Sequence, residues 1–244
     1  MAGLPLSTAA ARAWAAGLGC EPRLLDEPGA HLVPGGPQLD GFRAVYLARI
    51  GPAVLVYCPD QLRRRAAAVL AATAPGELFT AHTCASLAGL AGVTQPQVHG
   101  PSWHGFTDAV HFRPVVPAAG RRLDRADPLL AGLRAACGDA DWAESGFTGP
   151  DGVVYGIEQD GRLAAAGNLT PFGGHRADVG LLTHPAARGR GLATRIAVRM
   201  ITDALPAAGL VRYRALASNT PSLAIASSLG FAGCGQNLMT PLPG

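Results

Sequence analysis

A glycine-rich basic turn at residues 188–193 is the part of the sequence whose residue types best suit chemistry. It reads Arg188-Gly-Arg190-Gly191-Leu-Ala193 and lies between a strand-like run and a long amphipathic segment. The first N–H groups of a helix lack partners within the helix, and the helix dipole places positive potential there. Glycines allow the backbone to approach a ligand, and arginines add charge-assisted hydrogen bonds. The turn predicts an anion site, with a solvated basic helix start as the alternative.

Two common phosphate-binding motifs are excluded at this turn. A Walker loop would end in Gly-Lys-Ser/Thr, which is absent. A dinucleotide fingerprint would need a third glycine and an acidic residue about 20 positions further on, and both are missing here. No magnesium-binding motif accompanies the turn, so a nucleotide-phosphate enzyme is the weakest alternative.

The elements on either side of the turn must hold it in place. Residues 177–183 predict a strand, and Pro185 cannot donate to a ladder. The segment after the turn predicts an amphipathic helix that ends through Pro206 and Gly209. Its apolar face contains Ala193, Ile196, Ala197, Met200, Ile201 and Ala204.

Further elements flank this core of the pattern. Residues 127–137 predict a helix capped by Asp127, and Asp160-Gly161 predicts a hairpin between the strand-like runs 152–159 and 163–170. Residues 210–217 predict another strand. A short helix follows, with Asn219 or Thr220 as its cap, Pro221 in its first turn and Gly230 at its end.

This order of motifs resembles the GNAT superfamily of acyltransferases, which bind acetyl-CoA. The resemblance covers residues 123–242 approximately, and it is carried by Arg188-x-x-Gly191-x-Ala193, Asn219-x-x-Ser222 and Leu229-Gly230-Phe231. It implies an α/β fold in which helices flank a mixed, splayed β-sheet. CoA would lie between two neighbouring parallel strands of that sheet.

The resemblance also implies roles for individual residues. Backbone amides of the turn and helix start would hold the CoA pyrophosphate, at Arg188, Gly189, Arg190, Gly191, Leu192, Ala193 and Thr194. Leu181, Leu182 and Thr183 would pair with the pantetheine arm, and one amide there would polarise the thioester carbonyl. Asn219 would meet the pantetheine or the adenosine side, with Ser222 nearby.

The sequence departs from the family pattern at the group that protonates the leaving thiolate. Many members carry a tyrosine where this chain has Ala226. Because a thiol has a pKa of about 8.5, its thiolate is a fair leaving group even without an acid. Solvent, Ser227 or Ser228 would protonate it in place of the tyrosine. The departure also favours an alternative function, a CoA-binding or regulatory module without catalysis.

The general base is open as well, because an attacking amine must lose a proton. Asp178 at the start of a strand and Glu144 in "DWAESGF" are the candidates, while Glu158, His175 and His184 carry weaker signals. A solvated carboxylate is the alternative for each acid. His104 beside Trp103 indicates either a substrate pocket or a structural loop.

Composition bounds the whole chain. With 48% hydrophobic and 15% charged residues among 244, the protein has enough apolar residues for a core. The net charge is +3 without a basic stripe interleaved with aromatics, which argues against nucleic acid. Five scattered cysteines without a C-x-x-C pair imply no metal and indicate reduced thiols in the cytoplasm. The sequence contains no uninterrupted apolar run of about 18 residues, so no membrane partner is expected.

Residues 1–118 predict a smaller N-terminal α/β domain before the acetyltransferase domain at 119–244. Strands are expected at 42–50 and 53–59. A helix is expected at 61–73, with Arg63–Arg65 on its solvent-exposed face, and a short helix at 83–92. Residues 99–122 are rich in Gly and Pro and predict a loop and linker. The domain would cover or shape the acceptor site, and a degenerate copy of the second fold is an alternative.

The function that the resemblance implies is an acyl-CoA-dependent N-acetyltransferase. Acetyl-CoA would be the co-substrate, no metal would take part, and an unidentified amine would attack the acetyl carbon directly without a covalent enzyme intermediate. The acceptor and the oligomeric state, a homodimer being one option, stay open.

Overall fold

A computed structural model describes residues 6–149 and 151–243, and these residues divide into two compact units. Unit 1 contains the chain up to His104, Leu216–Ser218 and the segment that begins at Gly233. Unit 2 contains Gly105–Ala215 and Asn219–Ala232. Within the described residues, no helix has the length and apolar character needed to cross a membrane.

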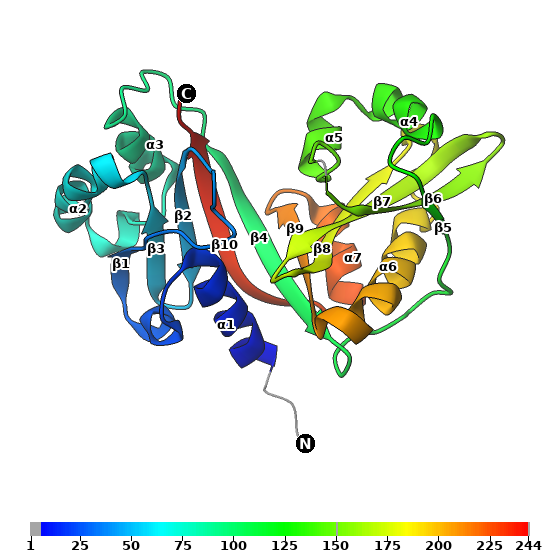
Figure 1. The fold of residues 1–244 in the computed structure, drawn as a ribbon, viewed down its shortest axis with the longest axis horizontal. Coiled ribbons are helices and arrows are strands. Elements are labelled where there is room, and N and C mark those ends of the chain that lie inside the picture. Colours follow the sequence, from blue (N-terminus) through cyan, green and yellow to red (C-terminus); the bar gives the residue numbers. More distant parts are fainter. Residues whose placement is uncertain (1–5, 150, 244) are drawn as a thin grey trace. The chain divides into compact units, whose positions relative to one another are not determined.

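Unit 1 is a mixed sheet with helices (Figure 1). Its strands β1, β3, β2 and β10 pair in that order, β1 parallel to β3 and the other pairs antiparallel. The elements are α1 (Leu6–Leu18), β1 (Gly29–Leu32), β2 (Ala44–Ile50), β3 (Ala53–Tyr57), α2 (Arg63–Ala72), α3 (Ala81–Gly89) and β10 (Ala232–Pro241). Short 3₁₀ turns cover Pro22–Asp26, Asp60–Leu62 and Pro75–Glu77.

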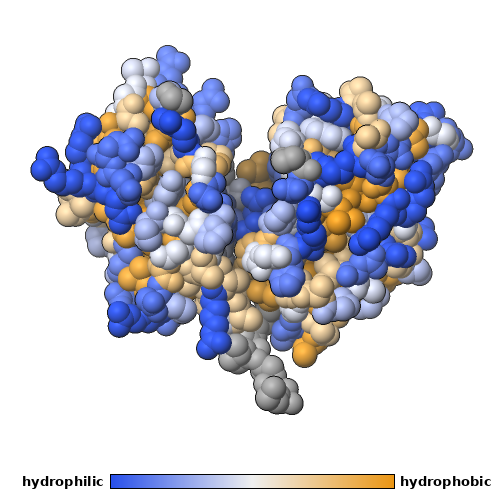
Figure 2. Space-filling model, in the orientation of Figure 1, coloured by the Kyte–Doolittle hydropathy of each residue, from blue (hydrophilic) through white to orange (hydrophobic). Residues whose placement is uncertain are grey.

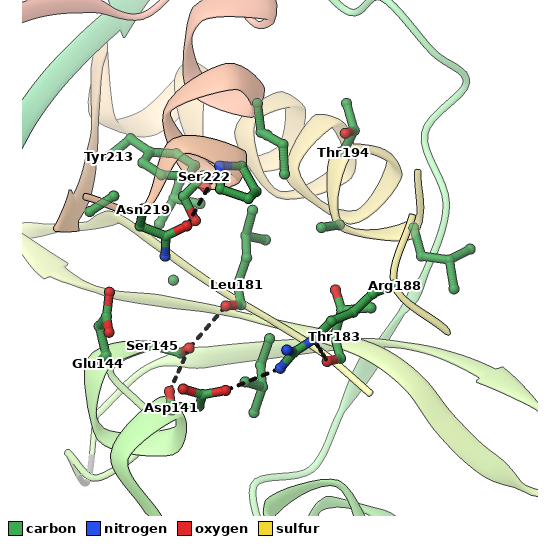
Figure 3. Close-up of a pocket in the computed structure, with 18 of the residues that line it drawn as sticks. Asp141, Glu144, Ser145, Leu181, Thr183, Arg188, Thr194, Tyr213, Asn219 and Ser222 are labelled. Atoms are coloured by element: carbon green, nitrogen blue, oxygen red, sulfur yellow. Dashed lines mark hydrogen bonds and ion pairs between the residues drawn. The ribbon is translucent and has the colours of Figure 1, made fainter. Parts of the chain in front are cut away.

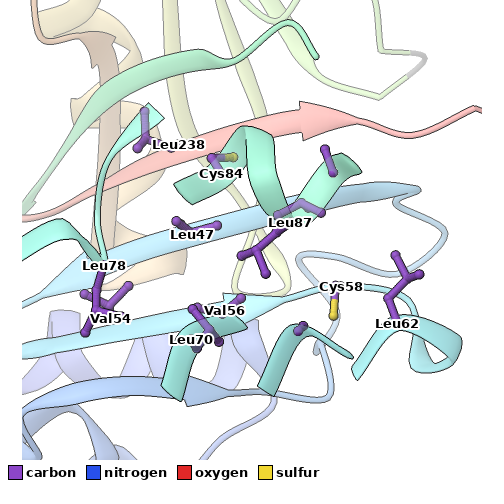
Figure 4. Packing of buried hydrophobic residues seen from close by; sticks show 13 residues of the cluster. Leu47, Val54, Val56, Cys58, Leu62, Leu70, Leu78, Cys84, Leu87 and Leu238 are labelled. Carbon is purple, nitrogen blue, oxygen red and sulfur yellow. The ribbon is translucent and has the colours of Figure 1, made fainter. Parts of the chain in front are cut away.

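The core of unit 1 lies between its sheet and helices α2 and α3 (Figure 4). Leu47, Val54 and Val56 contribute from the sheet, and Leu238 joins them from the far end of the chain. The sequence predicts Arg63 on the solvent-exposed face of its helix. In the structure it is half-buried, and its guanidinium donates to the Val33 carbonyl at 2.7 Å.

In unit 2 the strands pair in the order β5-β6-β7-β8-β9. Among these strands of unit 2, β8 pairs with β9 in parallel, and the other three pairs are antiparallel. Its elements are β5 (Arg121–Leu123), α4 (Leu129–Cys137), α5 (Asp139–Glu144), β6 (Val153–Gln159), β7 (Arg162–Phe172), β8 (His175–Thr183), a 3₁₀ turn (Pro185–Ala187), α6 (Leu192–Ala208), β9 (Leu210–Leu216) and α7 (Thr220–Ser228).

The two faces of the unit 2 sheet are covered differently. Helix α4 closes one apolar cluster, in which Leu130 and Leu133 meet Leu163 and Leu182. Helix α6 packs directly on β7, because a Cβ on Gly167 would lie 2.1 Å from the sulfur of Met200. On the face shown in Figure 2, hydrophilic residues are interspersed with hydrophobic ones on the visible surface of each unit.

The mixed α/β fold class is confirmed, and most predicted elements of unit 2 are present. Asp160 and Gly161 both have positive φ, as a tight hairpin turn requires. The Asp127 carboxylate accepts from the Leu129 N–H at 3.0 Å and so caps α4. The predicted end of α6 is partly wrong: the helix runs through Pro206 and ends at Gly209, whose φ of 66° supplies the left-handed cap.

The Gly- and Pro-rich segment 99–122 is not a loop throughout, which corrects the prediction. It contains β4 (His99–Asp108), which begins in unit 1 and ends in unit 2, and β5. A side-chain contact joins the middle of β4 to β10, where His104 Nε2 and Asn237 Oδ1 are 2.6 Å apart. Such a partner from the distant C-terminus overrides local composition.

The predicted division at 118/119 also differs from the structure. The units separate after His104, and unit 1 takes back the C-terminal strand because β10 pairs with β2. The role of the N-terminal part at the acceptor site stays a prediction.

Candidate functional site

The parallel strands β8 and β9 of unit 2 separate and leave a cavity between them (Figure 3). Within the described part of the chain, their register covers only Asp178 with Arg212 and Val179 with Tyr213. β8 then runs on to Thr183 and β9 to Leu216. The cavity has a volume of about 660 Å³, which lies in the range of small-molecule and cofactor sites.

The glycine turn forms one wall of this cavity. Gly189 and Gly191 have φ values of 75° and 71°, a conformation that strongly favours glycine. Gly191 caps α6, and its carbonyl accepts the first helical hydrogen bond from Arg195. The N–H groups of Leu192 to Thr194 therefore lie at the open end of a 17-residue helix and favour an anion.

The free edge of β8 forms a second wall. The His184 N–H donates to a carbonyl of β7 at 3.0 Å, so the peptide groups of Leu181 and Thr183, which alternate with it, point to the cavity edge. Two side chains meet their carbonyls there: Ser145 Oγ donates to Leu181 at 2.9 Å, and Arg188 Nε donates to Thr183 at 3.3 Å. The N–H groups of the same two residues share this edge and suit an extended amide-containing ligand.

Arg188 also ties the glycine turn to helix α5. Its Nη2 lies 3.1 Å from Asp141 Oδ2, and its Nε reaches the Thr183 carbonyl. The guanidinium therefore shapes the cavity wall, while exposed Arg190 also lines it and offers a cation to an anionic ligand.

Helix α7 closes the cavity from above in Figure 3. Asn219 Oδ1 accepts from the Ser222 N–H at 3.2 Å, which caps the helix and fixes the amide group. Asn219, Pro221, Ser222 and Ile225 all line the cavity. The asparagine thus has a structural role at the helix start and a place in the wall.

The family comparison agrees with this geometry. Residues 123–231 match the model of the acetyltransferase (GNAT) family. These residues form a GNAT domain. The match runs from Leu123, the last residue of β5, to Phe231, just before β10, and leaves most of unit 1 outside it.

Solved structures are similar to this chain at low sequence identity, and the first of those below has a TM-score above 0.5. A Drosophila protein is 21% identical with a TM-score of 0.51, covering 65% of this chain and 56% of that chain. A candidate GNAT acetyltransferase from Novosphingobium aromaticivorans is 23% identical, with a TM-score of 0.46 and coverage of 62% and 68%. A GCN5-related N-acetyltransferase-like protein from Streptococcus suis is 14% identical, with a TM-score of 0.45 and coverage of 87% and 81%. A search among curated proteins finds no match.

The GNAT domain brings the predicted CoA-binding residues together. All twelve line the cavity, namely Leu181, Leu182, Thr183, Arg188, Gly189, Arg190, Gly191, Leu192, Ala193, Thr194, Asn219 and Ser222. Of the three predicted catalytic residues, only Glu144 lines it, from the exposed end of α5.

Asp178 lies outside the cavity wall, which corrects its prediction as a base. Its carboxylate is 3% exposed and accepts two hydrogen bonds from Arg212 at 2.9 Å and one from Arg214 at 3.0 Å. Burial raises the pKa of Asp178, but the charges of Arg212 and Arg214 outweigh burial and hold this pKa well below its ordinary value. The carboxylate is a structural anion rather than a proton acceptor.

Ser228 is not placed as an acid either. It is exposed on α7, outside the cavity wall, and its hydroxyl donates to the Ile225 carbonyl at 2.8 Å. Ala226, at the family's tyrosine position, is fully buried and carries no polar group.

Sequence reasoning missed several residues of the wall. Among them are Gly180 of β8, Ser145, which packs against it from the end of α5, and Tyr213 of β9. In the sequence Val211, Tyr213 and Ala215 alternate with two arginines along the predicted strand, and this period would have placed Tyr213 on an inward face. The described residues contain no group of three or more His, Cys, Asp or Glu able to hold a metal.

Proposed function

We propose that the protein is an N-acetyltransferase that uses acetyl-CoA and an amine acceptor. The observation that carries the proposal is one cavity in which a glycine-capped helix N-terminus and a free strand edge meet. The first suits a pyrophosphate and the second suits the amides of a pantetheine arm. Both belong to a domain of the GNAT family.

The residues present fit this co-substrate. Acetyl-CoA supplies an acetyl group activated as a thioester. The N–H groups of residues 192–194 would hold the pyrophosphate, with Arg190 as an additional cation. Leu181 and Thr183 would bind the pantetheine arm through their N–H groups, and an N–H of this edge would donate to the carbonyl oxygen as negative charge develops on it.

Glu144 is the proposed proton acceptor for the amine. It lines the cavity from α5, on the side opposite Asn219 (Figure 3). Its carboxylate would take the amine proton directly or through one water molecule. Attack on the acetyl carbon would then proceed without a covalent enzyme intermediate, and positioning would lower most of the barrier.

A CoA-binding module without catalysis is the second candidate. The buried methyl group of Ala226, where many family members carry a tyrosine, favours it. The two candidates predict the same cavity and the same affinity for the nucleotide part, so they differ only in turnover.

The first measurement is a calorimetric titration of acetyl-CoA into the wild type and Gly191→Glu. A carboxylate at the capping position would repel the pyrophosphate and strain a residue with positive φ. We expect binding to fall at least about 100-fold, as for the loss of charge-assisted hydrogen bonds.

Gly173→Glu is the matched control, because Gly173 also has positive φ and open space but lies in the β7–β8 hairpin turn, outside the cavity wall. The control should bind acetyl-CoA as the wild type does. Equal loss in both variants would contradict the proposed phosphate cradle, as would wild type that binds ATP but not acetyl-CoA.

Turnover then separates the two candidates. Thiol release from acetyl-CoA would be followed over a panel of small amines, amino acids and peptides. Release that depends on an amine supports the transferase, whereas tight binding of acetyl-CoA with no amine-dependent release supports the binding module.

A further inference from the structure

The Tyr213 hydroxyl is a polar group at the cavity to which the proposed function gives no role. Tyr213 lies on β9 opposite Val179, at the last parallel pair before β8 and β9 separate. It lines the cavity although it is only 2% exposed. Its side chain therefore borders the cavity at the end where the two strands are still paired.

Two neighbours hold this side chain in one position. The Phe231 ring packs edge-on against it with centroids 5.4 Å apart. The side chain of Ser222, in the first turn of α7, hydrogen-bonds with Tyr213. Figure 3 shows Tyr213 and Ser222 side by side at the top of the cavity.

Strand direction indicates which part of a ligand would reach Tyr213. The glycine turn follows the carboxyl end of β8, so a ligand anchored there by its pyrophosphate runs back along the edge from Thr183 to Leu181. Continuing in this direction it reaches the closed end at Val179 and Tyr213. The thioester lies beyond the pantetheine amides and would therefore occupy this end.

The hydroxyl keeps its proton under ordinary conditions. Burial raises the pKa of Tyr213 to about 12, with the hydrogen bond from Ser222 lowering it by less. A neutral phenol is available as a hydrogen-bond donor at neutral pH, and a buried donor next to a developing negative charge stabilises that charge.

We propose that Tyr213, held by Ser222, donates a hydrogen bond to the sulfur of the leaving thiolate. The inference rests on the proposed function. As the amine nitrogen bonds to the acetyl carbon, the carbon–sulfur bond breaks and its electron pair stays on sulfur. Tyr213 stabilises this charge without giving up its own proton, and water protonates the thiolate after release. The amine proton passes to Glu144.

The test compares the affinities of CoA and desulfo-CoA, in which hydrogen replaces the thiol, at pH 7 and pH 9.5. A thiol with a pKa of about 8.5 is mostly thiolate at the higher pH. In the wild type we expect the preference for CoA to rise about tenfold or more between the two pH values, as for a hydrogen bond to a charged group. Tyr213→Phe should abolish this rise, and Ser222→Ala should reduce it.

Tyr155→Phe is the control. Tyr155 is a fully buried tyrosine of the same unit outside the cavity wall, and its hydroxyl donates to Asp203 at 2.9 Å. The control should keep the wild-type rise, which separates loss of the sulfur contact from general loosening of the core.

Two results would overturn the inference. The first is that Tyr213→Phe keeps the full rise in preference for CoA over desulfo-CoA between pH 7 and pH 9.5, or that the wild type binds CoA but shows no such rise. The other is wild type that binds neither CoA nor desulfo-CoA, which would overturn the proposed function and the inference together. The two failures are therefore distinguishable.

Discussion

Gly180 lets the chain after α5 lie directly against strand β8. A Cβ at this position would lie 2.0 Å from the carbonyl oxygen of Ser145, well inside contact distance. Ser145 also donates to Leu181, so the same contact positions the strand edge that faces the cavity. A single missing carbon atom thus fixes part of the binding wall.

Gly180→Ala should therefore weaken both folding and binding. We expect a loss of about 1–3 kcal/mol in the free energy of unfolding, typical of overpacking, because the clash is with backbone. Acetyl-CoA affinity should fall as well, since the Leu181 edge must shift. Urea denaturation and calorimetry measure the two effects.

Gly132→Ala provides a control of opposite sign. Gly132 lies on α4 with open space where its Cβ would be, so alanine should stabilise the helix by about 0.5–1 kcal/mol and leave binding unchanged. A destabilised Gly132→Ala, or an unchanged Gly180→Ala, would contradict this account of the close approach.

At the scale of elements, the Asp178 carboxylate joins β8 to β9 where the two strands are still paired. Arg212 is 6% exposed, and its guanidinium also lies 4.1 Å from the Phe172 ring centre. Because both partners of the Asp178–Arg212 pair are buried, removing one leaves an uncompensated charge.

Asp178→Asn should destabilise the protein by about 3–5 kcal/mol at pH 7. The folded pKa of Asp178 is lowered, so its contribution is present above the unfolded pKa near 3.8 and is lost as pH falls below that value. The difference between wild type and variant should therefore shrink in acid. Urea denaturation at pH 7 and pH 3 measures it.

Asp151→Asn is the matched control, because the Asp151–Arg176 pair is exposed and 3.6 Å apart. It should change the free energy of unfolding by less than about 1 kcal/mol. A difference for Asp178→Asn that grows as pH falls would contradict the buried ion pair.

At the scale of the whole molecule, the last strand of the chain completes the first unit. β10 pairs with β2 from Gln236–Arg49 to Pro241–Ala44. Leu238, 3% exposed, packs into the core of unit 1, while the cavity is lined by residues of unit 2 alone. Stability of unit 1 and binding in unit 2 thus depend on different residues.

Leu238→Ala should separate these two properties. We expect a loss of about 2–5 kcal/mol in the free energy of unfolding, as for a buried leucine. Amide hydrogen exchange should rise in β2, β3 and β10, and the affinity for acetyl-CoA should stay at the wild-type value. A loss of protection centred on α6 would contradict the assignment of this strand to unit 1.

The sequence by itself determined the local parts of the site. The Gly189 and Gly191 turn, a helix cap at Asn219 or Thr220 and the Asp160-Gly161 hairpin depend on backbone conformation and nearest neighbours, so the sequence predicts them, and the structure assigns the cap to Asn219. The amphipathic period of α6 likewise needed no partner to be recognised.

Only the tertiary structure decided the non-local parts. Asp178 looked like a base until Arg212 and Arg214, more than 30 positions further along the chain, occupied its oxygens. Tyr213 gained a place in the cavity through Phe231 and Ser222, and β4 became a strand although its composition predicted a loop. Ion pairing and strand pairing depend on which distant segments meet in the fold, and the local spacing of residues does not predict which segments these are.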